Sequence, residues 1–435
     1  MSAQLCDLSI SDQKRASEAG VVPTELLAQQ TRAAIERREP ELKAWVQLSS
    51  DLAFQSQKVD DISAALPLRG ISLGVKDLID VVGLPTRAGS PVTSSAPAAA
   101  DAACVARLRA LGTVVQGKTV TTEFGYFFPG PTRNPHSAGH SPGGSSSGSA
   151  AAVGARTIPL ALGTQTAGSL TRPASYCGAA GMVLAHGSTS MAGIVGLSPS
   201  LDTLGLLTRT IEDLRLVYRA FTGHRSSAAR PAGVDTVFLW HGSELDAVDT
   251  SMGFVLQQIP ELIKNLGIEC RPLEWDDRIH RLTSDHLTVM AYEAAHARAG
   301  ELHDHGLGLS SALRQLLNDG SRISADAHRA ALVRRDQLGE QLAALLGPGS
   351  VVIGPAALGP APMGLAATGS PILSRPWQLL GLPVVVVPGA RTAQGLPLGI
   401  QIIGLPGKEP QMLDLAAELE KLLRAMQPAP QGSPL

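Results

Sequence analysis

Short apolar runs alternate with glycine-rich turns and alanine-rich segments along most of this chain. Runs such as residues 71–75, 158–162 and 384–387 have the length and composition of buried strands, and segments of helical character lie between them. Strands that alternate with helices pack as one sheet with helices against it, because each element must bury its apolar side. The sequence therefore predicts an α/β fold built around a large sheet.

Four successive segments are expected within this fold. Residues 1–65 are expected to be an N-terminal helical segment, since residues 23–38 carry apolar side chains at helical spacing. Residues 66–220 form the core, and residues 221–348 form a peripheral or inserted layer with longer polar helices. Residues 349–435 return to sheet character and complete the same domain. The chain shows no internal repeat and no long linker, so one large domain is expected.

The composition excludes several classes of function. The chain has 36 Lys and Arg against 38 Asp and Glu, a formal charge of −2, and so lacks the basic surface that nucleic-acid binding requires. Its four cysteines lie far apart, which indicates neither a disulfide framework nor a zinc site. The polar N-terminus lacks the apolar segment of a signal peptide, and Gly, Pro and Ser interrupt the longest uncharged stretches. We expect a cytoplasmic protein that binds neither nucleic acid nor membrane.

The most unusual segment is rich in glycine and serine and spans residues 140–152. Composition alone allows a flexible linker, but the segment runs directly into an alanine-rich helix and an apolar strand. A phosphate-binding loop would require a GxxxxGK[ST] pattern, which the chain lacks. Residues 144–148 fit the GxSxG pattern with Ser146 as the nucleophile, yet a polar, proline-containing stretch precedes them where a buried strand should stand. Another serine of the segment is therefore the better candidate.

A second glycine-rich loop follows the apolar run at residues 158–162. It has the sequence GTQTAGSLTR over residues 163–172 and presents Ser169 in a tight turn after a strand. A short helix and this strand separate the two loops, so Ser145 and Ser169 are expected at the same end of the sheet. A serine hydroxyl is a weak nucleophile unless a neighbouring base takes its proton, so a base is required.

The required base is not obvious among the eleven histidines, most of which lie in the polar helices of the peripheral segment. Residues 303–305, His-Asp-His, are expected on a solvated helix face rather than at a metal. Lysine is scarce, and Lys76 follows the apolar residues 71–75, which would desolvate its amino group and lower its pKa toward that of a general base. Lys118 is the rival candidate for the base. The alternative for Lys76 is that it has no catalytic role and that its side chain extends from the strand end to solvent.

Taken in order along the chain, these motifs resemble those of the amidase signature family. The two serines are 24 residues apart, which is the spacing of that family. The matching segments are residues 74–77, 143–149, 163–169, 177–178, 197–205, 211–214 and 395–404. The resemblance covers most of the chain outside residues 225–345 and implies one large mixed sheet with helices on both faces.

The resemblance implies a catalytic triad of Lys76, Ser145 and Ser169. Ser169 would attack the carbonyl carbon, Ser145 would relay the proton after a cis peptide bond, and a neutral Lys76 would accept it. The oxyanion hole would consist of the backbone N–H groups of four successive residues, Thr166, Ala167, Gly168 and Ser169. The resemblance implies no metal and no cofactor.

Three positions depart from the family pattern. Ala167 stands where a second glycine is usual, so the oxyanion loop would be strained if that position required a positive φ. Residues 183–185 replace a common Lys-Pro-Thr element, and Ser374 replaces a frequent asparagine. A pocket that differs from those of most relatives is therefore expected.

Two features bear on the substrate. Arg172 lies three residues after Ser169, as in malonamidase-like relatives, and would clamp a carboxylate through two parallel hydrogen bonds. A structural ion pair is the alternative role of Arg172. Tyr126 and Tyr176 lie near the catalytic loops and would instead suit an apolar or aryl acyl group.

The expected function is hydrolysis of a C–N bond in a small amide or carbamate (urethane), through an acyl-enzyme on Ser169. The alternative is the glutaminase subunit of a tRNA-dependent amidotransferase, and a catalytically silent binding relative is a third class. The resemblance also allows a homodimer as the assembly.

Overall fold

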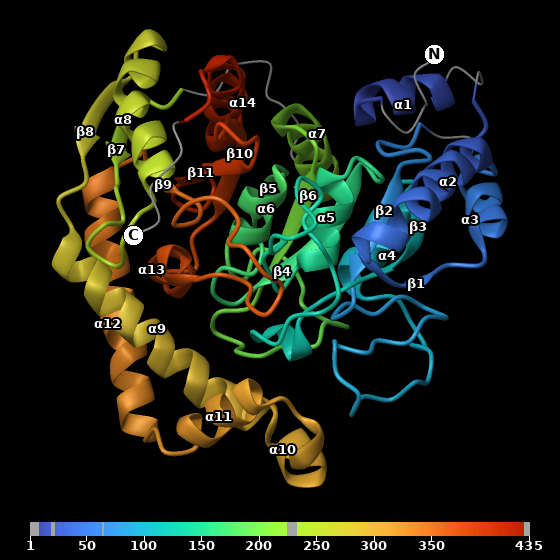
Figure 1. The fold of residues 1–435 in the computed structure, drawn as a ribbon, viewed down its shortest axis with the longest axis horizontal. Coiled ribbons are helices and arrows are strands. Elements are labelled where there is room, and N and C mark those ends of the chain that lie inside the picture. Colours follow the sequence, from blue (N-terminus) through green and yellow to red (C-terminus); the bar gives the residue numbers. More distant parts are fainter. Residues whose placement is uncertain (1–7, 19–21, 63–64, 224–232, 430–435) are drawn as a thin grey trace.

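Strands from most of the chain combine into one mixed sheet. The computed structural model describes residues 8–18, 22–62, 65–223 and 233–429, so Cys6 lies outside the described residues. Among the described residues, eleven strands pair in a single sheet (Figure 1). In sheet order they are β1 (Trp45–Leu48), β3 (Val114–Thr119), β2 (Ser72–Lys76), β4 (Leu160–Gln165), β6 (Thr203–Thr208), β5 (Ala180–Val183), β10 (Val384–Arg391), β11 (Pro397–Ile403), β9 (Ser350–Pro355), β7 (Thr236–Leu239) and β8 (Glu269–Pro272). The expected α/β fold is confirmed.

Helices pack against both faces of this sheet. Alternate residues of a strand point to opposite faces, so Val385 and Val387 of β10 join one core while Val384 and Val386 join the other. The first core also receives α1 (Ile10–Glu18), α4 (Ala103–Ala110), α7 (Ile211–Thr222), α8 (Thr250–Asn265) and α14 (Glu409–Ala425). The second receives α5 (Ser147–Gly154), α6 (Thr171–Cys177), α9 (Asp276–Ala297), α11 (Ser311–Gly320), α12 (Ala325–Leu346) and α13 (Arg375–Leu379).

The expected peripheral layer shares the sheet of the core. Strands β7 and β8 lengthen that sheet beyond β9, while α9, α11 and α12 pack on one another, with α10 (Ala299–His305) beside them at the lower edge of Figure 1. The N-terminal segment holds α2 (Thr24–Leu42) and α3 (Leu52–Asp60), but it also contains a strand, β1, which pairs with β3. Residues 1–65 are therefore not purely helical.

The glycine- and serine-rich segment is packed structure and not a linker. It leads into α5, whose residues are almost all buried. A Cβ at Gly148 would overlap the carbonyl oxygen of Ala44 and the nitrogen of Val120. The close approach of α5 to the sheet therefore requires glycine at this position.

The sheet also determines where the functional loops meet. Strands β2 and β4 are parallel neighbours, with Val75 opposite Leu162. Their carboxyl ends, at Lys76 and Gln165, lie at the same edge, and ligands of α/β sheets bind at such edges. The loop that carries Ser169 consequently begins beside Lys76.

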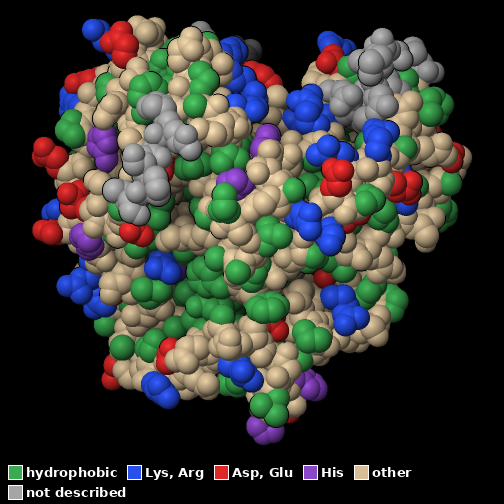
Figure 2. Space-filling model, viewed as in Figure 1, with side chains coloured by type: hydrophobic (Ala, Val, Ile, Leu, Met, Phe, Trp, Pro, Cys, Tyr) green, Lys and Arg blue, Asp and Glu red, His purple; other side chains and the backbone are tan. Residues whose placement is uncertain are grey.

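The outer surface mixes both charges. On the face shown in Figure 2, Lys, Arg, Asp and Glu side chains are spread over the outer parts, whereas hydrophobic side chains gather near the lower centre. Within the described residues, none of the helices has the combined length and apolar character that a membrane span needs.

We predict that Gly148→Ala lowers the free energy of unfolding by about 1–3 kcal/mol or more, because the added methyl group meets backbone atoms that cannot move independently. Thermal unfolding measures this loss. Gly253→Ala on α8 is the matched control, since no atom lies within 4 Å of the added Cβ and alanine favours a helix. Equal stability of the two variants would contradict the close packing of α5.

Candidate active site

Lys76 is the last residue of β2, and its side chain is fully buried. Its Nζ lies 2.6 Å from Ser145 Oγ and 2.8 Å from Thr164 Oγ1. Within the described residues no carboxylate forms an ion pair with it. Burial holds the pKa of Lys76 well below its usual range, and the charge of Asp202 offsets this effect only in part. These surroundings therefore favour the neutral amine, whose lone pair can accept a proton, over the ammonium ion.

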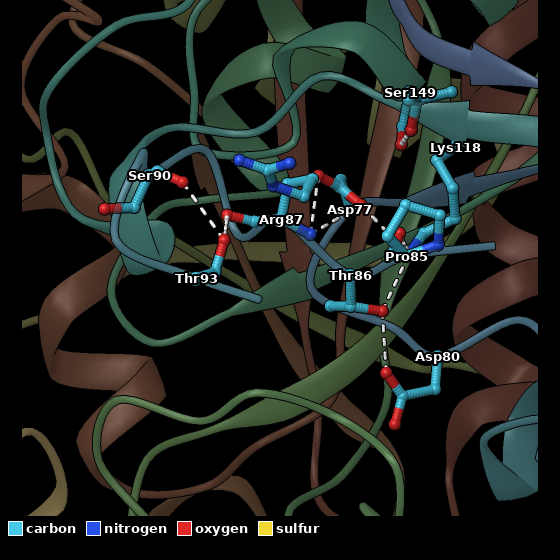
Figure 3. Close-up of polar contacts among 10 residues, drawn as sticks. Asp77, Asp80, Pro85, Thr86, Arg87, Ser90, Thr93, Lys118 and Ser149 are labelled. Carbon is cyan, nitrogen blue, oxygen red and sulfur yellow. Dashed lines mark hydrogen bonds and ion pairs between the residues drawn. The ribbon is translucent and has the colours of Figure 1, made fainter. Parts of the chain in front are cut away.

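Lys118, the rival candidate for the base, has a different role. Its Nζ forms an ion pair with Asp77 Oδ1 at 2.9 Å, and both side chains are fully buried. Lys118 also donates to Thr86 Oγ1 at 2.9 Å, and Figure 3 shows it pointing toward the loop at Pro85 and Thr86. Its amino group is thus engaged with a carboxylate and a hydroxyl away from the two serines.

The structure brings Ser145 and Ser169 together, as the sequence predicts. Both line one pocket, and the N–H of Ser146 donates to the carbonyl oxygen of Ser169 at 3.0 Å. The peptide bond between Gly144 and Ser145 is cis. The Ser146 side chain is fully buried and donates to the Thr164 carbonyl, so it does not face the pocket as a GxSxG nucleophile would.

The loop between β4 and α6 presents a row of backbone N–H groups. Within the described residues, the N–H groups of residues 166–169 donate no hydrogen bond to the protein. The next two N–H groups, of Leu170 and Thr171, are both accepted by Gln165 Oε1. Ala167 does not have a positive φ, so the strain considered for an alanine at this position does not arise. All four residues of this row line the pocket, where their N–H groups are free to bind an oxyanion.

Thr166 is held by groups from two other segments. Its hydroxyl donates to Asp202 Oδ1 at 2.5 Å, and its carbonyl oxygen lies 2.9 Å from Nε2 of His286 on α9. His286 was not predicted from the sequence. The signal was present, because His286 is spaced by four residues from both Leu282 and Met290 and so shares their buried helix face.

The pocket in front of the serines encloses about 360 Å³, including its open mouth. Its lining contains no Asp or Glu but two arginines, Arg172 and Arg375. Tyr126 lines the pocket as predicted, whereas Tyr176 does not and lies buried on α6. The apolar part of the lining is formed by Tyr126, Phe127, Leu197, Met290 and Pro371.

Arg172 is buried without a counter-ion. It donates to the Gly144 carbonyl at 2.6 Å and to Thr368 Oγ1 at 3.2 Å, and within the described residues it forms no ion pair. Its Nε and Nη1 have no partner. Burial lowers the pKa of Arg172 to about 10, and the charge of Arg375 adds to this effect. The structural ion pair considered for Arg172 is therefore not observed among the described residues, and its guanidinium lies buried at the pocket without an opposite charge.

The other residues noted in the sequence, Ser374, His303 and His305, do not line the pocket. Ser374 Oγ is 2.7 Å from Thr171 Oγ1 and so supports the start of α6. His303 and His305 are exposed, as expected for a solvated face. In the part of the chain that the structure describes, no group of three or more His, Cys, Asp or Glu residues could hold a metal ion.

The low pKa of Lys76 predicts a pH-dependent stability. The unfolded chain restores the usual pKa of 10.5, so below that value unfolding takes up a proton at Lys76. We expect the wild type to lose stability relative to Lys76→Met as the pH falls from 10.5 toward neutral, by up to about 1.4 kcal/mol per pH unit. Denaturant unfolding of both proteins measures the difference. A constant difference would mean that Lys76 is charged in the folded protein.

Known proteins with the same architecture identify the family. The family model described as Amidase matches residues 27–413. AmiA2 of Mycobacterium tuberculosis, named as an amidase, is 32% identical and covers 92% of this chain and 90% of its own. A glutamyl-tRNA(Gln) amidotransferase subunit of Exiguobacterium sibiricum is 29% identical and covers 88% of this chain and 91% of its own. A crystal structure of an amidase has a TM-score of 0.85 at 26% identity and covers 95% of this chain and 100% of its own. The chain therefore belongs to the amidase signature family and is a hydrolase of C–N bonds.

Proposed function

We propose that this protein hydrolyses a small amide or carbamate through an acyl-enzyme on Ser169. One observation carries the proposal. A fully buried lysine without a counter-ion places its Nζ 2.6 Å from Ser145 Oγ, at the edge of a pocket that also holds Ser169. A desolvated, neutral amine beside a serine pair is the arrangement that serine nucleophile activation requires.

In the acylation step, Ser169 Oγ forms a bond to the carbonyl carbon of the substrate. Its proton passes to Ser145 Oγ, and the proton of Ser145 passes to the lone pair of Lys76 Nζ. The carbonyl oxygen becomes an anion and binds the N–H groups of residues 166–169, which have no other partner among the described residues.

The same protons return when the C–N bond breaks. Lys76 gives its proton back through Ser145 to the leaving nitrogen, which departs as a neutral amine because an amide anion is a very poor leaving group. Water then attacks the acyl carbon while Ser145 and Lys76 accept its proton, and this proton passes to Ser169 Oγ as the bond to the acyl carbon breaks and the acid leaves. For a carbamate ester, the same attack at the carbonyl yields an alcohol, carbon dioxide and an amine overall.

The charges of the pocket favour a substrate with a carboxylate. Arg172 is buried with two unpartnered nitrogens, Arg375 lines the same pocket, and no acidic residue lines it. A buried guanidinium without an anion is costly, and a carboxylate bound in the pocket would supply the opposite charge that Arg172 lacks. We infer that the substrate is a small amide or carbamate that carries an acid group, with its apolar part against Tyr126 and Met290.

The glutaminase subunit of an amidotransferase is the alternative, because several relatives are named as amidotransferase subunits. The absence of the Lys-Pro-Thr element at residues 183–185 and the formal charge of −2 weigh against it. Co-purification with two partner proteins would favour this alternative. The proposed reaction itself requires no metal, cofactor or nucleic acid, and a homodimer is the assembly that we expect.

Ser169→Ala and Lys76→Ala should each lower kcat by about 10⁴-fold or more, because members of a catalytic triad act as a unit. Hydrolysis of small amides, anilides and aryl carbamates measures the activity, and circular dichroism checks the fold. A fluorophosphonate should label Ser169 of the wild type, with the site located by peptide mass spectrometry.

Ser146→Ala is the matched control for these variants. The Ser146 side chain is buried behind the pocket, so we expect at most a few-fold change in kcat and unchanged labelling at Ser169. Loss of labelling in Ser146→Ala, with labelling retained in Ser169→Ala, would instead identify Ser146 as the nucleophile.

Arg172→Met and Arg375→Met should each reduce kcat/KM for a dicarboxylic acid monoamide by about 10- to 100-fold, the value of a charge-assisted hydrogen bond. The methyl ester of the same monoamide is the internal control and should lose much less. An equal loss for the charged and the neutral substrate would show that the arginines act only on the shape of the pocket.

A further inference from the structure

Helix α9 of the peripheral layer reaches the oxyanion loop through one side chain. His286 is fully buried, and its Nε2 lies 2.9 Å from the carbonyl oxygen of Thr166. A carbonyl oxygen only accepts hydrogen bonds, so Nε2 carries the proton and the neutral ring has its lone pair on Nδ1. Within the described residues Nδ1 has no partner, so this one hydrogen bond is the polar contact that the ring makes.

The hydrogen bond between His286 and Thr166 determines the direction of the N–H group of Ala167, which belongs to the oxyanion loop. Thr166 and Ala167 share one planar peptide unit, in which the carbonyl and the N–H of a trans bond point in opposite directions. His286 holds the Thr166 carbonyl toward its own position on α9, and His286 does not line the pocket. The N–H of Ala167 therefore points to the opposite side, where residues 166–169 line the pocket.

The second contact of Thr166 does not replace the first. The Thr166 hydroxyl donates to Asp202, whose other oxygen accepts the N–H groups of Leu197 and Ser198. This contact restrains the side chain of Thr166 but not the rotation of the peptide that follows it. A rotated peptide would turn the carbonyl toward the pocket, where its partial negative charge would repel an oxyanion.

We infer that His286 is a positioning residue, which fixes the peptide between Thr166 and Ala167 so that the oxyanion hole is formed before substrate binds. The inference rests on the proposed function. His286 does not line the pocket, so it does not act on the substrate itself. Burial lowers its pKa to about 3, and the ring thus stays neutral and keeps the same donor over the working pH range.

The test compares a variant that keeps the donor with one that lacks it. His286→Gln places an amide nitrogen the same number of bonds from Cα as Nε2, whereas His286→Leu fills similar space without a donor. His280→Leu, at an exposed position of α9, is the matched control. The first readout is the second-order rate constant for labelling of Ser169 by a fluorophosphonate, because its phosphoryl oxygen enters the oxyanion hole. The second readout is kcat and KM for hydrolysis of 4-nitrophenyl acetate.

We expect His286→Leu to lower the labelling rate and kcat by about 10- to 100-fold, somewhat less than the loss of an oxyanion donor itself, with KM changed less than about twofold. His286→Gln should retain activity within about threefold of the wild type, and His280→Leu should match the wild type. A purely structural histidine would affect thermal stability without this split between kcat and KM and without rescue by glutamine.

Equal labelling rates in His286→Leu and the wild type would overturn the inference, as would equal losses in the Leu and Gln variants. If His286→Leu does not fold, His286→Asn takes its place, because its amide stops one bond short of the Thr166 carbonyl. Failure of the wild type to label at Ser169 would instead refute the proposed function, so the two failures are distinguishable.

Discussion

The site depends on the burial of an uncharged lysine. Two lysines lie on neighbouring parallel strands, with Lys118 opposite Val75 and Lys76 opposite Thr119. Lys118 is stabilised by a carboxylate, Asp77, whereas the hydrogen-bond partners of the Lys76 amino group among the described residues are two hydroxyls and one carbonyl oxygen. Because an ammonium without a counter-ion is costly to bury, the second environment selects the neutral amine. Within the described residues, two buried lysines on neighbouring strands thus differ in one respect, since Lys118 has a carboxylate partner and Lys76 has none.

The pocket is assembled from segments that are distant in the chain. Strands β2 and β4 bring Lys76 and the Ser169 loop to one edge of the sheet, and the turn before α5 adds Ser145. The C-terminal part contributes Arg375, and α9 contributes Met290 to the lining. The peripheral layer therefore contributes to the pocket, and its two strands continue the central sheet.

Much of the fold and of the site could be predicted from sequence because local patterns encoded them. The apolar runs at residues 71–75 and 158–162 marked β2 and β4, and two glycine-rich loops marked the serines. Strand β1 was missed, since its four residues form a strand only by pairing with β3. Tyr176 was assigned to the pocket on proximity along the chain, but the turn of α6 directs it into the interior.

The sequence by itself determined the candidate residues, through two glycine-rich loops, a scarce lysine among apolar neighbours and the resemblance of these motifs to one family. Only the tertiary structure shows that Lys118 is paired with Asp77 while Lys76 contacts Ser145, and the pKa of each lysine depends on these surroundings. The same holds for Arg172 and His286. Whether a buried arginine has a counter-ion, and which carbonyl a histidine contacts, follows from helices and loops that meet only in the folded chain.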